Sequence, residues 1–155
     1  MRPAGQRDGI DLGFVGAVDQ VNVEPIESVL HQGRIPVVAS IGIGYDGSAY
    51  NVNADAVATE LAVALQADKL ILLTDVSGVR DRSGALLTEL DAAGAEQLVA
   101  EGIVDGGMVP KVHAASRAAV AGSAAHIIDG TVPHALLLEL LTEHGVGTMF
   151  NPVRT

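Results

Sequence analysis

Residues 69–79, with the sequence KLILLTDVSGV, decide the fold of this chain. The part from 69 to 75 is a short apolar run with polar ends, which is typical of a strand buried on both faces of a parallel sheet. A turn follows directly, and Gly78 can adopt the positive φ that many turns require. Strands of this kind need helices on both faces, so the stretch favours an α/β fold.

Other segments extend the same alternation along the chain. Apolar runs predict strands at 35–40, 125–129 and 147–150, the first two buried, and one or two short strands within 10–23. The Asp46-Gly47 pair between two β-like runs predicts a hairpin. Helical patterns with start and stop signals predict helices at 24–33, 53–67, 91–101, 110–122 and 131–145, the last capped by Thr131 with Pro133 in its first turn.

Together these elements predict a three-layer α/β sandwich with a mostly parallel central sheet. The sequence has no internal repeat, low-complexity tract or linker, so we expect a single domain over residues 1–155 with an irregular lead-in at 1–10. In sheets of this type, ligands lie beyond the carboxyl ends of the strands. The polar residues in the loops after those ends are therefore the candidates for a site.

Composition excludes several classes of function. The formal net charge of −10 argues against a nucleic-acid-binding protein, which needs a basic face. The chain has no cysteine and its five histidines lack paired ligand spacing, so we expect no protein metal site. No signal peptide and no apolar stretch long enough for a bilayer are present, which favours a cytoplasmic protein without a membrane partner.

The first candidate loop contains Asn51, Asn53 and Asp55. Alternation places the two asparagines on one side of an extended segment, and Asp55 falls in the first turn of the following helix. One interpretation is purely structural, because Asn53 is a good N-cap and a carboxylate suits the positive end of a helix. The other interpretation is a polar ligand site made by two amides and a carboxylate.

Two further loops combine glycine with polar residues. Thr74, Asp75 and Gly78 lie at and just after the carboxyl end of the strand at 69–75, either as an ordinary turn or as a contact to a lysine or a ribose hydroxyl. Gly106, Gly107, Met108 and Lys111 surround a predicted helix start. A cation is disfavoured in a first helical turn, so Lys111 is either a solvated side chain or the partner of a bound anion. A histidine inside a predicted strand, His126, is expected to be structural.

Five segments, in order, resemble the N-acetylglutamate kinases of the amino-acid kinase superfamily. They are DLGFVGAVDQVN at 11–22, IPVVASIGIGYDGSAYNVNAD at 35–55, LILLTDVSGV at 70–79, GGMVPKV at 106–112 and HIIDGTVPHALLLELLTEHGVGTMF at 126–150. The resemblance covers nearly the whole chain, and it implies the ATP-binding half of the amino-acid-kinase, or carbamate-kinase-like, fold. It also implies transfer of the γ-phosphoryl group of ATP to the side-chain carboxylate of N-acetyl-L-glutamate, a step of arginine biosynthesis.

The resemblance implies roles for individual residues. Lys111 would stabilise the transferring phosphoryl group, Asp55 would organise the catalytic lysines, and Asn51 and Asn53 would line the acetylglutamate site. Residues 74–78 and 103–108 would hold the nucleotide, including Thr74, Asp75, Gly78, Gly106, Gly107 and Met108 together with Lys111. The cofactor would be Mg²⁺ held mainly by the ATP phosphates.

The chain also departs from the family. No glycine-rich segment and no second catalytic lysine precede residue 11, and Lys69 is the only other lysine. We therefore expect an incomplete enzyme without the N-terminal substrate domain, which binds ATP or ADP with little turnover. A non-catalytic remnant that pairs with a full-length or complementary kinase chain is the alternative, and another amino-acid kinase specificity is a third.

Two expectations concern partners and regulation. An exposed sheet edge favours association, so we expect a homo-oligomer. In arginine-inhibited members the effector lies near the C-terminal end of this domain, where His126, Glu139 and Gly147 occur here. Because that inhibitor site also uses an N-terminal helix, the sequence does not support arginine regulation.

Overall fold

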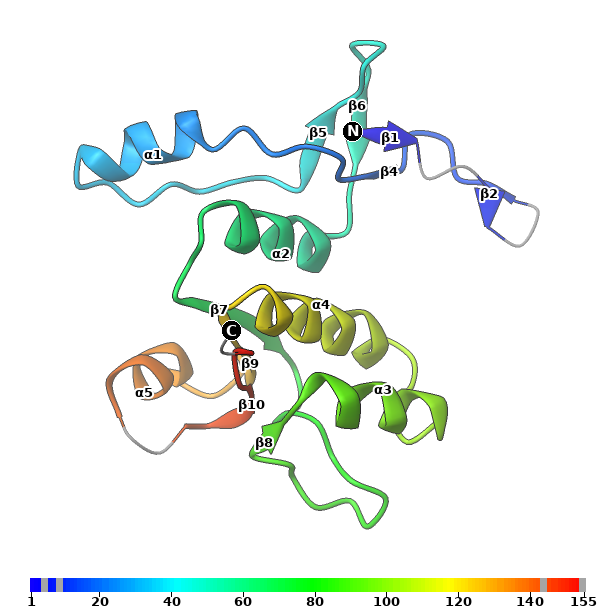
Figure 1. Ribbon diagram of the computed structural model, residues 1–155, viewed down its shortest axis with the longest axis vertical. Helices are drawn as coiled ribbons and strands as arrows, with labels where there is room; N and C mark the ends of the chain where they lie inside the picture. Colours follow the sequence, from blue (N-terminus) through cyan, green and yellow to red (C-terminus); the bar gives the residue numbers. More distant parts are fainter. Residues whose placement is uncertain (4–5, 8–9, 143–144, 154–155) are drawn as a thin grey trace. The chain divides into compact units, whose positions relative to one another are not determined.

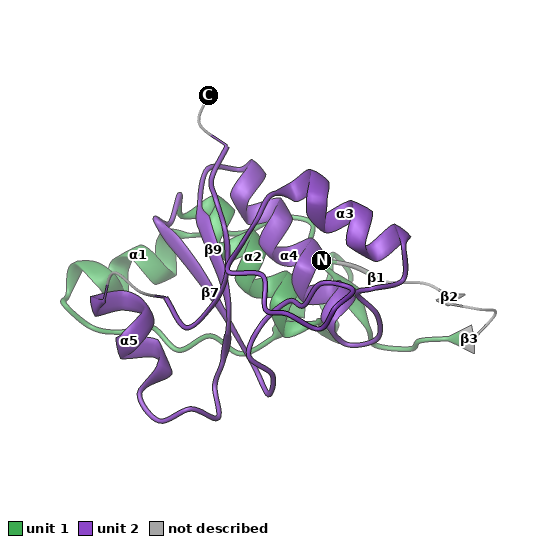
Figure 2. Cartoon of the chain, turned by 90° about the horizontal axis from the view of Figure 1, so that it is seen from below, with its two compact units in different colours: residues 1–65 green, residues 66–155 purple. Residues whose placement is uncertain are grey.

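The computed structural model describes residues 1–3, 6–7, 10–142 and 145–153 (Figure 1). The chain forms two compact units, Met1–Leu65 and Gln66–Thr155 (Figure 2). The prediction of a single domain over residues 1–155 stays a prediction. None of the helices in the described part of the chain is long and apolar enough to cross a membrane.

The first unit contains short paired strands and two helices. β1 (Arg2–Pro3) pairs with β4 (Gly16–Ala17), β2 (Gln6–Arg7) with β3 (Ile10–Asp11), and β5 (Ile41–Ile43) with β6 (Ala49–Asn51), all antiparallel. The helices are α1 (Glu24–His31) and α2 (Ala54–Ala64). These bounds confirm the short strands predicted within 10–23 and both predicted helices.

The predicted hairpin is confirmed between β5 and β6. Gly47 has φ of 82°, a conformation that residues with a side chain rarely adopt. The backbone amide of Gly44 donates to the carbonyl of Ser48 and closes the turn. The carboxylate of Asp46 accepts from the amide of Ser48, so its pKa lies below the ordinary value, mainly because of that bond. Tyr50 of β6 is buried and also donates to Asp46. The hairpin therefore carries the chain directly into the loop that contains Asn51 and Asn53.

The predicted buried strand at residues 35–40 is wrong. The segment forms no strand, and Ile35 and Val37 are 88% and 95% exposed. A continuous apolar run becomes a buried strand only where neighbouring strands and helices enclose it, and β5 and β6 of this unit pair with one another instead. The apolar composition of residues 35–40 indicates that burial would be favourable, but it does not identify the elements that would bury them.

The second unit is built on a four-stranded sheet with the order β7-β9-β10-β8. The strands are β7 (Lys69–Thr74), β8 (Glu89–Leu90), β9 (Ala124–Asp129) and β10 (Gly147–Phe150). β9 runs parallel to β7 and antiparallel to β10, and β8 runs parallel to β10. The predicted mostly parallel sheet is therefore confirmed for this unit, with the antiparallel β9–β10 pair as its one reversal.

Helices cover both faces of this sheet. α4 (Met108–Val120) packs on β7, β9 and β10, and α3 (Ala92–Ala100) packs on α4. α5 (Ala135–Leu141) packs on β9 from the opposite side (Figure 1). The buried face of α4 is mostly alanine, which allows a close approach to the sheet and explains how a chain with 3% aromatic residues builds its core.

Two helix starts differ from the predictions. α4 begins at Met108 rather than Pro110, because proline is compatible with the first helical turn as well as with its first position. α5 begins at Ala135, and Thr131 does not cap it. Instead, the carboxylate of Asp129 accepts from both the amide and the hydroxyl of Thr131, which makes a local turn that delays the helix.

Phe150 anchors the core of the second unit and has no exposed surface. We predict that Phe150→Ala lowers the free energy of unfolding by about 3–5 kcal/mol, because it leaves a cavity in close-packed surroundings. Chemical denaturation measures this loss. Leu141→Ala is the matched control, since Leu141 is 76% exposed and its truncation should change stability by less than about 0.5 kcal/mol. Equal losses in the two variants would contradict the core described here.

Candidate functional site

The second unit has a cavity of about 180 Å³ near the carboxyl end of β7. Its first wall consists of Val76 and residues 78–81, which follow β7. Its second wall consists of residues 103–105 and Met108, at the start of α4. Both walls lie in loops at the end of a strand or the start of a helix, where α/β sheets hold their ligands.

The first wall is fixed by a long-range contact to β10. Gly78 has φ of 135°, and a Cβ at this position would lie 2.7 Å from Oγ1 of Thr148. The predicted positive φ of Gly78 is therefore confirmed, and close approach to β10 is a second reason for glycine. The amide of the next residue, Val79, donates to the same hydroxyl at 2.8 Å.

Beyond Val79 the wall continues into a tight hairpin. The Arg80 guanidinium donates to the carbonyl of Gly84 and to the hydroxyl of Ser77, at 2.7 and 2.9 Å. The carboxylate of Asp81 accepts from both the hydroxyl and the amide of Ser83, and these bonds, led by the hydroxyl, lower the pKa of Asp81. Arg80 and Asp81 therefore order the edge of the cavity through their own hydrogen bonds.

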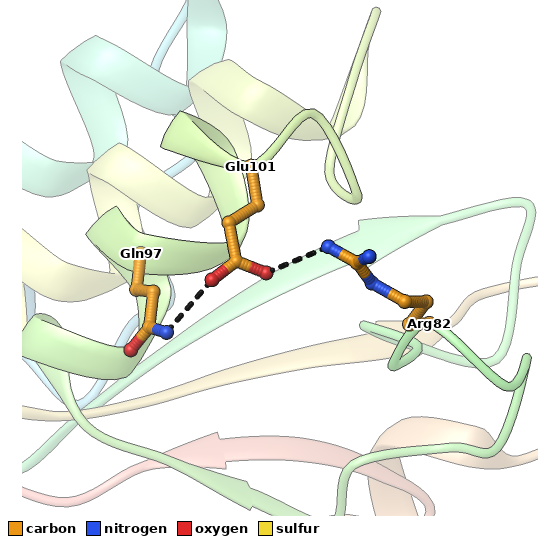
Figure 3. A network of polar contacts seen from close by, with 3 residues as sticks. All are labelled: Arg82, Gln97 and Glu101. Carbon is orange, nitrogen blue, oxygen red and sulfur yellow. Dashed lines mark hydrogen bonds and ion pairs between the residues drawn. The ribbon is translucent and has the colours of Figure 1, made fainter.

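A polar network links this hairpin to the end of α3 (Figure 3). Arg82 donates to one carboxylate oxygen of Glu101 at 3.1 Å, and Gln97 donates to the other at 2.8 Å. The pKa of Glu101 is lowered first by the Gln97 bond and then by Arg82. The three side chains are exposed, so the network contributes little to stability, but it connects the hairpin to the helix that leads into the second wall.

The start of α4 has the properties of an anion cradle. Its N-cap is Gly107, which offers no side-chain oxygen to the first amides, and no acidic residue lies in its first turn. Gly106 has φ of 52°, and a Cβ on either glycine would meet no atom within 4 Å. Lys111 lies in the same first turn and is half-buried. Open space at a helix start and a nearby lysine suit a phosphate group, but Pro110 has no amide hydrogen and the amide of Met108 already donates to the carbonyl of Asp105.

The remaining predicted residues lie in the first unit. Asn51 ends β6, and its amide donates to the carbonyl of Phe14. Asn53 caps α2 by accepting from the amide of Ala56 at 3.0 Å, so the structural interpretation of Asn53 is confirmed. Asn51 and Asn53 are both exposed and flank buried Val52, as alternation predicts. Asp55 lies half-buried in the first turn of α2.

The structure thus brings together only part of the predicted set. Gly78 and Met108 line one cavity, while Thr74 and Asp75 lie at the end of β7 outside its lining. Gly106, Gly107 and Lys111 form the adjoining cradle. Sequence reasoning missed Val79, Arg80 and Asp81, because an apolar residue and two charges in a turn look like any solvated hairpin.

A second cavity of about 390 Å³ lies elsewhere in the same unit. It is lined by charged and polar side chains, namely Lys69, Glu89, His126, Glu139, Thr88 and Thr142, together with Gly145, Gly147 and Met149. Nδ1 of His126 lies 2.6 Å from Oε1 of Glu139, and the amide of Val146 donates to Oε2 of Glu139 at 2.9 Å. Both side chains are buried, so a carboxylate is held inside the molecule by an imidazole and a backbone amide.

His126 is structural at one nitrogen only. With Nδ1 engaged by Glu139, Nε2 is buried and has no hydrogen-bond partner among the described residues. Burial is the largest cause that lowers the pKa of His126; Glu139 opposes it, and Lys69 adds to it. A buried nitrogen without a partner in a polar cavity is a position where a ligand or a water molecule would gain a hydrogen bond.

The lowered pKa predicts a pH dependence of stability. The unfolded chain takes up a proton on His126 at a higher pH than the folded chain, so the free energy of unfolding falls as the pH decreases below 6.5. We predict that the melting temperature decreases from about pH 7.5 to about pH 5.5, and that His126→Asn reduces this slope. His113→Asn, which removes an exposed histidine, should keep the wild-type slope. An unchanged slope in His126→Asn would contradict the assignment.

Comparison with known proteins identifies the family. Residues 2–129 match the family model described as amino acid kinase family. The acetylglutamate kinase of Moorella thermoacetica is 52% identical in an alignment 155 positions long that covers 95% of this chain and 52% of that protein. The chain thus spans about half the length of this curated relative.

Solved structures show the same fold. The crystal structure of N-acetylglutamate synthase from Neisseria gonorrhoeae, in complex with coenzyme A and L-arginine, superposes with a TM-score of 0.89 at 29% identity, covering 98% of this chain and 36% of that one. Carbamate kinase from Giardia lamblia bound to AMP-PNP has a TM-score of 0.68 at 21% identity, covers 90% and 47%, and supports the fold alone. The predicted carbamate-kinase-like fold is confirmed, and the chain belongs to the amino acid kinase family.

Proposed function

We propose that the protein is a phosphotransferase that moves the γ-phosphoryl group of ATP to the side-chain carboxylate of N-acetyl-L-glutamate, and that the second unit supplies its nucleotide site. The anion cradle at Gly106, Gly107 and Lys111, beside the cavity of residues 76–81 and 103–108, is the observation that carries the proposal. The 52% identity to an acetylglutamate kinase supports the choice of substrate. The cytoplasmic location and the homo-oligomer predicted from the sequence belong to the same proposal.

The proposed reaction needs positioning and positive charge more than covalent help from the protein. A carboxylate oxygen of acetylglutamate attacks the γ-phosphorus, the bond from that phosphorus to the β–γ bridging oxygen breaks, and ADP leaves with that electron pair. No proton has to move, because the nucleophile is already ionised. Negative charge spreads over the transferring oxygens, and a lysine ammonium such as that of Lys111 stabilises it.

The residues of the cradle fit a nucleotide polyphosphate with its Mg²⁺. The two glycines leave room for phosphate oxygens near the backbone at the start of α4. The cavity beside the cradle, lined by apolar Val76, Val79 and Met108, suits a base or ribose. Mg²⁺ would be held mainly by the ATP phosphates.

The first unit would contribute the acetylglutamate side of the reaction. Asn51 and Asn53, which flank buried Val52, offer exposed side-chain amides. Asp55 supplies a carboxylate two residues further along the chain. Since Asn53 also caps α2, its side-chain oxygen is committed and only its amide nitrogen is left for a substrate oxygen. Asp55 would act as an organising carboxylate rather than as a base.

Nucleotide binding tests the proposal directly. We predict that isothermal calorimetry detects saturable MgADP binding, and that Lys111→Ala weakens it by about 10–100-fold, since a charge-assisted contact to phosphate is worth about 1.5–3 kcal/mol. The matched control is Lys69→Ala, because Lys69 is the other lysine of the chain and lines the second cavity instead.

Two outcomes would contradict the proposal. Absence of saturable binding at millimolar MgADP would remove the nucleotide site, and unchanged affinity in Lys111→Ala would remove this lysine from it. Release of ADP in the presence of acetylglutamate, lost in Asp55→Ala, would exclude the alternative of a non-catalytic remnant.

The second cavity favours a regulatory function beside the kinase activity. Its buried Glu139, with Glu89 and Lys69 on the same walls, offers acidic groups for a guanidinium and an ammonium for a carboxylate. The similar structure of N-acetylglutamate synthase contains L-arginine. We therefore propose, against the expectation from the sequence, that this cavity binds L-arginine.

Arginine binding has its own prediction. L-Arginine should raise the melting temperature of the wild-type protein by ligand linkage, whereas L-citrulline, its uncharged near-isostere, should not. Lys69→Ala should reduce the arginine effect and keep MgADP binding, while Lys111→Ala should do the reverse. Equal effects of arginine and citrulline in a thermal-shift titration would contradict an acidic guanidinium pocket.

A further inference from the structure

A hydroxyl from the last strand completes the base of the hairpin beside the nucleotide cavity. Val79 and Leu87 face each other across this hairpin, and the amide of Leu87 donates to the carbonyl of Val79 at 2.9 Å. In an antiparallel pair of this kind the two residues normally exchange both amide–carbonyl bonds. Here the amide of Val79 donates to Oγ1 of Thr148 at 2.8 Å, and that hydroxyl donates to the carbonyl of Leu87 at 2.6 Å.

The Thr148 hydroxyl therefore stands in place of one direct bond between the hairpin strands. Thr148 has no exposed surface, the bond from Val79 is buried, and the bond to Leu87 is part-buried. The backbone of β10 adds a third tie, since the amide of Met149 donates to the carbonyl of Thr88, directly after Leu87. The bridge requires a side chain that both donates and accepts, and a hydroxyl does so through a single oxygen atom.

The bridge acts on residues that line the nucleotide cavity. Gly78 and Val79 belong to its first wall, and a Cβ on Gly78 would contact the same Thr148 hydroxyl at 2.7 Å. Arg80 also orders the hairpin by donating to the hydroxyl of Ser77 and to the carbonyl of Gly84. Without the inserted hydroxyl, Val79 and Leu87 either lose a hydrogen bond each or close on one another, and in both cases the wall moves.

We propose that Thr148 is a positioning residue for the nucleotide: its hydroxyl sets the spacing of the hairpin at Val79 and Leu87 and thereby the affinity of the cavity for the nucleoside part of ATP and ADP. The inference rests on the proposed function, because it assigns the cavity of residues 76–81 and 103–108 to that ligand. Thr148 itself contacts the loop backbone.

Three variants test the inference. Thr148→Val keeps the shape and removes both hydrogen bonds, Thr148→Ser keeps the hydroxyl, and Ser116→Ala removes another buried hydroxyl of the same unit, whose oxygen has no partner among the described residues. We expect MgADP affinity, measured by calorimetry, to fall by about tenfold in Thr148→Val, in line with the loss of two hydrogen bonds. Thr148→Ser and Ser116→Ala should stay within about threefold of wild type.

The outcomes separate this inference from the proposed function. Absence of MgADP binding by the wild-type protein overturns both. Wild-type binding with equal affinity in a folded Thr148→Val overturns the inference alone. If Thr148→Val does not unfold cooperatively, Thr148→Cys replaces it, since a thiol forms weaker hydrogen bonds; equal affinities in Thr148→Cys and Thr148→Ser then overturn the inference. Amide exchange adds a local readout: the Val79 amide should lose protection in the valine variant and keep it in the serine variant.

Discussion

The second unit depends on β9, a strand that is hydrogen-bonded along both edges and covered on both faces. Ala125, Ile127 and Ile128 have no exposed surface, and each fully buried branched side chain contributes about 1.5–3 kcal/mol to stability. The parallel neighbour β7 and the antiparallel neighbour β10 are both positioned by this strand. Because β7 runs parallel to it, the loop after Thr74 emerges at the same end of the sheet as Asp129.

Residues of the short strand β10 line one cavity and position the hairpin beside the other. Gly147 and Met149 line the cavity that contains His126 and Glu139, while Thr148 between them holds the hairpin beside the other cavity. Alternation along the strand produces this division, since neighbouring side chains point to opposite faces. Gly147 has its own constraint, because a Cβ there would meet the carbonyl oxygen of Ile127. Because glycine has no side chain, Gly147 allows the close β9–β10 pairing.

Features of the fold that depend on a few neighbouring residues could be predicted from the sequence. The apolar run of β7, the asparagine cap of α2, the Asp46-Gly47 turn and the positive φ of Gly78 each depend on a few neighbouring residues. The prediction of a strand at residues 35–40 was wrong, because burial depends on neighbouring strands and helices that an apolar run does not specify. The start of α5 failed because the Asp129 carboxylate competes for the donors of Thr131.

The candidate site was predictable to a similar degree. Gly106, Gly107 and Lys111 combine glycines, a helix start and a misplaced cation, a pattern that local reasoning can recognise. The hydroxyl bridge of Thr148 joins residues 69 positions apart along the chain, and no periodicity or propensity carries such a contact. Arg80 and Asp81 were hidden for a related reason, since their hydrogen bonds decide the shape of a turn whose composition is ordinary.

The position of Thr148 also sets an order of events during synthesis. A chain emerging from the ribosome can form β7, α3 and α4 before β10 exists, yet β8 pairs only with β10 in the described sheet. The hairpin between Val79 and Leu87 must wait for the same strand to receive its bridging hydroxyl. Because these contacts join residues far apart in the chain, the cavity at residues 76–81 and 103–108 can be completed only after β10 has been synthesised. A nascent chain can thus form β7, α3 and α4 and still lack a finished cavity until β10 has left the exit tunnel.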